Sequence, residues 1–136
     1  MAATKTIKQT DFLPGVTPQQ VYDALVDPRI HSDFTGAKAT GQAKVGVKFT
    51  AWDGYITGKH LVLEPGKRVV QEWSTTDWPA GAAPSQVEWT FVRKKDGAEV
   101  TLVHSEVPAE QADMYLQGWI DYYWDPLKMY FEDAQE

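Results

Sequence analysis

The sequence contains no cysteine. Disulfide frameworks, cysteine–zinc sites and thiol catalysis are therefore excluded, and nothing indicates an oxidising compartment. No stretch approaches the roughly 18 consecutive apolar residues that a membrane span requires. Residues 1–5 are not followed by the apolar run of a secretory signal. We therefore expect a cytoplasmic protein with no membrane partner.

The short motifs of common catalytic and cofactor sites are also missing. There is no Gly-rich phosphate loop before a helix and no Gly-x-Ser-x-Gly elbow, so neither nucleotide binding nor serine catalysis is indicated. His31 and Asp33 have no third metal ligand at a suitable spacing. We therefore expect that the protein binds no metal and no cofactor, and we assign no catalytic residue.

Positive charge is scarce at the C-terminal end. The formal net charge is −6, yet residues 1–108 balance to zero. The whole excess lies in residues 109–136, where Lys128 stands against Glu110, Asp113, Asp121, Asp125, Glu132, Asp133 and Glu136. Such a surface repels a phosphate backbone, so nucleic acid is a poor partner. The segment is either a solvated helix face or an acidic docking strip for a basic partner.

The length of 136 residues and the apolar fraction of 43% are those of one globular domain. We find no repeat and no linker, and predict a single domain over residues 1–136 with an ordered core at about 5–132. A chain of this size buries enough surface to fold without a metal or disulfides.

The N-terminal third predicts a strand and two short helices. The strand covers residues 5–12, with Ile7 and Phe12 as its apolar positions. Thr17 then begins a helix as its N-cap, with Pro18 at the first helical position. Asp27 ends that helix and caps a short second one.

The middle of the chain predicts strands with short connections. Apolar residues alternate with polar ones over residues 47–51, 55–63, 69–73, 87–93 and 100–104. Asp53-Gly54 is a strong hairpin signal. Short connections of this kind indicate an antiparallel meander.

A long helix is predicted over about residues 109–132. Its apolar stripe comprises Leu116, Trp119, Ile120, Tyr123, Leu127 and Phe131. Pro126 interrupts the backbone hydrogen bonding, so we expect a kink near Asp125. We therefore predict an α+β fold, in which a curved antiparallel sheet of six or seven strands wraps around this helix.

The ordered set of residues resembles a known family. It is carried by Phe34-Thr35-Gly36-Ala37, Gly46 with Phe49, Asp53-Gly54 with Ile56 and Gly58, Leu63 with Pro65, Val69-Val70 before Trp73, Trp78-Pro79-x-Gly81, Thr90-Phe91, Val107-Pro108, Gly118-Trp119, Tyr122-Tyr123 and Phe131. The order resembles the START-like (SRPBCC) helix-grip fold. In detail it resembles the domain homologous to the C-terminal half of the activator of the 90-kDa heat-shock chaperone ATPase.

The resemblance implies a helix-grip domain linked to the stress response, with the 90-kDa chaperone as a possible partner. The full activators carry an additional N-terminal domain that supplies much of the chaperone contact, for which this sequence has no room. Standalone members include proteins thought to bind small hydrophobic molecules between the sheet and the long helix.

Strand parity and helical spacing direct a set of aromatic and polar side chains to the space between helix and sheet. These candidates are Phe49, Ile56, His60, Gln71, Trp73, Trp89, Phe91, Leu102, His104, Trp119 and Tyr123. They form either a packed core or the wall of a ligand cavity. Gly58, with its missing side-chain volume, and the inward Gln71 favour the cavity.

The histidines and one loop tryptophan remain open to two interpretations. His60 and His104 are either buried neutral groups bonded to neighbours, or groups that orient a ligand or exchange protons. We expect His31 to be exposed. Trp78, in a loop rich in proline and glycine, either covers the edge of the core or anchors a partner.

Three functions follow in order of preference. The first is a non-enzymatic binding protein for a small hydrophobic or aromatic molecule, as a monomer or homodimer. The second is a co-chaperone that binds the 90-kDa heat-shock chaperone and stimulates its ATPase. The third is a cyclase-like or hydratase-like enzyme that uses His60 and His104 in the same cavity.

Overall fold

The computed structural model describes residues 3–134, so Glu136 and the two ends of the predicted 1–136 domain lie outside it. Six strands and a series of helical segments make up the chain. The strands are β1 (Thr4–Pro14), β2 (Lys48–Ala51), β3 (Ile56–Glu64), β4 (Arg68–Thr75), β5 (Ser85–Lys94) and β6 (Gly97–Pro108). The helices are α1 (Pro18–Val26), α2 (Pro28–Thr35), η1 (Ala109–Gln111), α3 (Ala112–Trp119), η2 (Ile120–Trp124) and α4 (Asp125–Ala134).

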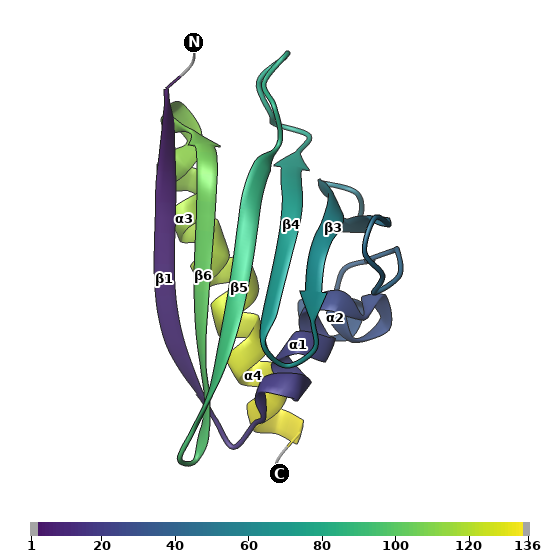
Figure 1. Ribbon diagram of the computed structural model, residues 1–136, viewed down its shortest axis with the longest axis vertical. Coiled ribbons are helices and arrows are strands. Elements are labelled where there is room, and N and C mark those ends of the chain that lie inside the picture. Colours follow the sequence, from purple (N-terminus) through teal and green to yellow (C-terminus); the bar gives the residue numbers. More distant parts are fainter. Residues whose placement is uncertain (1–2, 135–136) are drawn as a thin grey trace.

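The strands form one antiparallel sheet in the order β1-β6-β5-β4-β3-β2. The helical run from η1 to α4 crosses one face of this sheet diagonally, and α1 and α2 lie beside its C-terminal half (Figure 1). The predicted α+β helix-grip architecture is confirmed, with six strands. No helix within residues 3–134 is long and apolar enough to cross a membrane.

The alternation of the strands places their apolar faces as predicted. Val87, Trp89 and Phe91 are buried on β5, and Val100 and Leu102 are buried on β6. A residue in a strand points to the face opposite its neighbour, so a period of two fixes this outcome.

The first strand differs from its prediction by one position. Phe12 is 41% exposed, and Leu13, at 1%, takes the core position instead. Ile7 is buried, and Leu13 lies six residues further on, so the two share one face, whereas Phe12 falls on the other. Ile7 and Phe12, grouped in the sequence analysis as the apolar positions of this strand, therefore lie on opposite faces, because they are an odd number of residues apart.

Both N-terminal helices begin at the predicted caps. The Gln20 amide donates to Thr17 Oγ1 at 3.2 Å, while Gln20 Oε1 accepts from the Thr17 amide at 2.8 Å. Asp27 Oδ1 accepts from the Arg29 amide at 2.9 Å and so starts α2. Phe34 on α2 is buried against the long helix, with Tyr123 5.9 Å away between ring centroids.

The long helix is interrupted just before Pro126, where a kink was predicted. The interruption is a π-helical turn, η2, in which the Asp125 amide donates to the Ile120 carbonyl five residues back. This wider turn accommodates the proline, which cannot donate a hydrogen bond. It also places Tyr123 and Trp124 side by side in the core. Leu116, predicted in the apolar stripe, is 42% exposed, and Tyr115 is buried instead.

Candidate functional site

The aromatic side chains predicted to surround a cavity pack against one another at the centre of the molecule. The ring centroids of Trp119 lie 5.3 Å from Trp73, 5.6 Å from Trp89 and 4.9 Å from Tyr123. Phe91 and Leu102 are buried in the same cluster. The space left among these rings and α2 is about 30 Å³, the room of roughly one water molecule.

His104 is fully buried and both of its ring nitrogens are bonded. Nδ1 accepts from Trp119 Nε1 at 3.0 Å, so Nε2 carries the proton and donates to Ser85 Oγ at 2.7 Å. Ser85 Oγ in turn donates to the Trp73 carbonyl at 2.8 Å. Burial lowers the pKa of His104 to about 3. The ring is therefore a neutral structural link between the helix and three strands.

His60 and Gln71 lie at the other end of the same layer. Their side chains are 3.4 Å apart, and Phe49 stacks on the His60 ring at 4.9 Å. Burial lowers the pKa of His60. The expectation that Gly58 leaves an empty volume was wrong. A Cβ there would lie 2.6 Å from the Phe49 ring and 2.1 Å from the Glu72 carbonyl oxygen, so the space is already occupied.

His31 is buried, which corrects the prediction of an exposed side chain. Its Nε2 lies 3.0 Å from the Tyr123 hydroxyl and its Nδ1 lies 3.3 Å from the Leu25 carbonyl. Since a carbonyl can only accept, Nδ1 carries the proton and Nε2 accepts from Tyr123. Burial lowers the pKa of His31 to about 4 and raises the pKa of Tyr123.

A larger open space lies beside this core, between the β2–β3 turn and the long helix. We call it the aromatic groove. Its volume is about 410 Å³, within the range of small-molecule sites. It is lined by Trp52, Tyr55, Ile56, Trp73, Met114, Tyr115, Gly118, Trp119, Tyr122 and Tyr123. Four of the predicted cavity residues therefore reach it: Ile56, Trp73, Trp119 and Tyr123.

The turn that forms one wall of the groove has an unusual backbone. Trp52 and Asp53 have φ values of 51° and 58°, and Gly54 follows at 89°. Left-handed φ costs a non-glycine residue about 1–2 kcal/mol. Asp53 Oδ1 accepts from the Lys38 amide at 3.0 Å, which helps to hold the turn in place. The conformation sets Trp52 edge-on to Tyr122 across the groove, at 5.2 Å between ring centroids.

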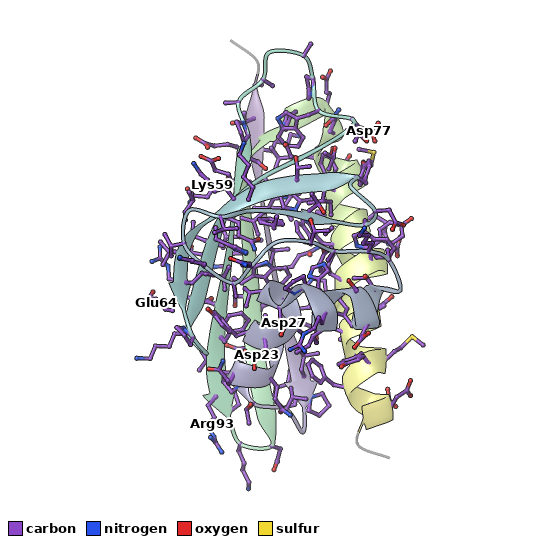
Figure 2. All side chains as sticks on the ribbon, turned by 90° about the vertical axis from the view of Figure 1, so that its right-hand side faces the viewer. Asp23, Asp27, Lys59, Glu64, Asp77 and Arg93 are labelled. Atoms are coloured by element: carbon purple, nitrogen blue, oxygen red, sulfur yellow. The ribbon has the colours of Figure 1, made fainter. Side chains whose placement is uncertain are left out.

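A polar cluster closes one end of the groove. The Tyr55 hydroxyl donates to Asp77 Oδ2 at 2.7 Å, and the Tyr115 hydroxyl lies 2.6 Å from Thr75 Oγ1. Burial and the hydrogen bond to Asp77 raise the pKa of Tyr55, and burial raises that of Tyr115. Asp77 lies on the helix side of the molecule, whereas Lys59 and Glu64 project from the far side of the sheet (Figure 2).

Trp78 covers the edge of the core next to this cluster. Its ring is 6.1 Å from Trp73 and 5.8 Å from Tyr115, between centroids, and its Nε1 donates to the Ala83 carbonyl at 2.9 Å. The side chain is half-buried, and its hydrogen bond to Ala83 lies within its own loop. Its contacts favour the first of the two interpretations of this residue.

Six groove residues were missed by sequence reasoning: Trp52, Tyr55, Met114, Tyr115, Gly118 and Tyr122. Four of them are on the helix at positions 114, 115, 118 and 122, a second stripe beside the core stripe. That spacing was a usable signal. No group of three or more His, Asp or Glu residues that could hold a metal occurs within the described residues.

Sequence comparison finds relatives along nearly the whole chain. Residues 15–132 match the family model described as Activator of Hsp90 ATPase homolog 1-like protein. The human Activator of 90 kDa heat shock protein ATPase homolog 1 is 32% identical over 126 residues, which cover 93% of this chain and 36% of that protein. The Dictyostelium discoideum homolog is 32% identical over 117 residues, covering 85% and 30%. The chain thus spans about a third of the length of these relatives.

Solved structures share the fold at lower identity. An HSP90 activator from Plasmodium falciparum has a TM-score of 0.82 at 20% identity, over 95% of this chain and 96% of that one. The Aha1 dimer from Colwellia psychrerythraea has a TM-score of 0.74 at 16% identity, over 89% and 92%.

Proposed function

The chain belongs to the family of Hsp90 ATPase activator homologues, and we propose that it is a non-enzymatic binding protein for a small hydrophobic or aromatic molecule. The aromatic groove carries this proposal. It is open to solvent, its volume suits a small molecule, and ten residues with mostly apolar or aromatic side chains line it. A cytoplasmic location is part of the proposal.

Binding without chemistry is favoured by the state of the histidines. An acid–base catalyst needs a ring nitrogen within reach of a substrate and a pKa near the working pH. Both nitrogens of His104 are bonded inside the core, and its pKa of about 3 keeps it neutral. His60 is buried behind Phe49 and does not line the groove. The enzyme hypothesis has no other candidate pair.

The backbone strain at Trp52 and Asp53 supports the same site. Strain of this kind persists where the surrounding structure holds it, and it concentrates at functional positions. Here the strained turn carries two groove residues, Trp52 and Tyr55, and so shapes one wall.

Gly118 offers a direct test, because it forms part of the groove wall. A Cβ at this position would meet only the Tyr122 ring, at an ordinary 3.8 Å. Gly118→Leu should fold and extend into the groove, while Gly118→Ala is the matched control that adds one methyl group. The probe is the neutral dye N-phenyl-1-naphthylamine, whose fluorescence rises in apolar surroundings.

We expect the dye to bind the wild-type protein and the alanine variant, and to bind the leucine variant at least about tenfold more weakly, because the side chain occupies the same volume. Equal binding to all three proteins, or no binding to the wild type, would refute the proposal. Native mass spectrometry of freshly purified protein would then show any co-purified molecule and whether the chain is a monomer or a homodimer.

A co-chaperone role is the second candidate, favoured because the relatives are named as activators of the 90 kDa heat shock protein ATPase. The acidic face of the helix, with Asp113 and Asp121 exposed, is the surface a basic partner would meet. In that case purified chain should raise the ATP turnover of the cognate 90-kDa chaperone, and salt should weaken the effect. A pull-down at low salt that captures no chaperone would remove this candidate.

A further inference from the structure

The hydrogen bonds at the closed end of the groove have only one consistent direction. The Asp77 carbonyl can only accept, so the group 2.7 Å away is the amide nitrogen of Gln111. Gln111 Oε1 therefore faces Tyr115 and accepts its hydroxyl proton at 3.1 Å. Thr75 must then donate to the Tyr115 oxygen. The carboxylate of Asp77 likewise can only accept, so Tyr55 donates to it.

Each hydroxyl proton of this cluster is therefore already used in a hydrogen bond within the protein. The protons of Tyr55, Tyr115 and Thr75 point to Asp77, Gln111 and Tyr115 respectively. At the groove wall, the oxygens of Tyr55 and Tyr115 can therefore only accept hydrogen bonds. The carboxylate of Asp77 lies next to the Tyr55 hydroxyl. The indole N–H of Trp52, another residue of the groove wall, makes no hydrogen bond within residues 3–134, but it is shielded from solvent and so is not presented to a ligand. This end of the groove therefore accepts hydrogen bonds and attracts positive charge.

The charge around the groove has the same sign. None of the lining residues is charged. Among their immediate neighbours in the chain, the charged ones are Asp53, Asp113 and Asp121, all acidic, together with Glu72, which pairs with Lys59 and points to the opposite face of the sheet. An anionic ligand would meet repulsion here, whereas a cation would be attracted over the distance of about 8 Å at which physiological salt screens charges.

We propose that the ligand of the aromatic groove is a hydrophobic organic cation, an ammonium group on an alkyl or aryl tail, with its charged head at the end formed by Tyr55, Tyr115 and Asp77. This rests on the proposed function. The aromatic rings attract a cation through their π faces, and the remaining wall buries the tail. A quaternary ammonium has no N–H to donate, so charge and the ring faces alone would hold it, and it leaves water at less cost than a strongly hydrated ion.

A series of probes with one tail and different heads tests the assignment. Octyltrimethylammonium, 1-octanol and octanoate are titrated, below micellar concentrations, against the dye bound in the groove. The cation should displace the dye at a concentration about five- to tenfold lower than the alcohol, with octanoate weakest, which is the size of effect a partly desolvated cation–π site gives.

Asp77→Asn should lower the affinity for the cation about threefold and leave that for 1-octanol unchanged, because asparagine still accepts from Tyr55 but carries no charge. Asp133→Asn, on the last turn of α4, removes the same charge far along the helix and should change neither affinity.

The outcomes separate the two proposals. If the alcohol displaces the dye as well as the cation does, or octanoate is the tightest probe, the groove binds hydrophobic molecules but the charge assignment is wrong. If Asp133→Asn lowers the affinity for the cation as much as Asp77→Asn does, the attraction depends on the net charge of the protein. The assigned position of the charged head is then overturned. If no probe binds, both proposals fall.

Discussion

Acid should destabilise this protein through two buried histidines. His31 and His104 are neutral in the fold, with pKa values of about 4 and about 3. In the unfolded chain both return to the ordinary value of about 6.5. As the pH falls below 6.5, the unfolded chain therefore binds more protons than the native one. Stability is full above that value, declines below it and levels off only near the folded pKa values.

The magnitude follows from those pKa values. Between pH 7.5 and pH 5, each histidine removes about 2 kcal/mol from the free energy of unfolding, because the unfolded imidazole is more than nine-tenths protonated at pH 5 while the folded one remains neutral. Together the two remove about 4 kcal/mol. This is a large part of the 5–15 kcal/mol by which domains of this size are usually stable.

Urea unfolding followed by tryptophan fluorescence at both pH values measures the loss. His31→Gln keeps an acceptor for Tyr123 and a donor for the Leu25 carbonyl, so it should fold and should lose about half of the pH dependence. His104→Gln should remove a similar share. Gln42→Asn, an exposed neutral change, should keep the whole dependence. If wild-type stability is the same at pH 5 and pH 7.5, the assignment of buried neutral rings is wrong.

Three further predictions concern the stability of variants at two glycines and at the N-cap of α1. Gly118→Ala should raise the free energy of unfolding by up to about 1 kcal/mol, measured by urea titration, because alanine favours a helix and the site has room. Gly58→Ala should instead abolish folding or cost more than about 3 kcal/mol by thermal melting, since its Cβ would overlap the Glu72 carbonyl. Thr17→Ala should cost about 1 kcal/mol in the same urea assay through loss of the bond from the Gln20 amide, and Thr17→Ser should restore most of it.

The sequence predicts best where a local rule decides the outcome. The caps at Thr17 and Asp27 depend on three or four neighbouring residues, and the inward faces of β4 to β6 depend on a period of two. These predictions are confirmed. The predicted order of strands and helices was enough to predict the fold, because a helix with so many aromatic residues needs a sheet to cover it.

The predictions that failed depend on residues far apart in the chain. His31 is buried because Tyr123, 92 residues away, donates to it. Gly58 does not open a cavity because the ring of Phe49 on the neighbouring strand fills the space. The groove forms because the β2–β3 turn faces the long helix, and no sequence pattern within either segment predicts that they lie together. Only the second stripe on the helix, which includes Gly118 and Tyr122, gave a local hint.

The π-helical turn before Pro126 has a consequence for the whole C-terminal segment. One additional residue per turn advances the following helix by about 100° relative to an uninterrupted α-helix. Leu127 and Phe131, which follow the wide turn, are both buried in the core. The wide turn thus sets which side of the last segment meets the sheet: converting it to a regular α-helical turn without removing a residue would rotate the last two turns of the helix away from the sheet, whereas deleting one of its residues would leave them in place.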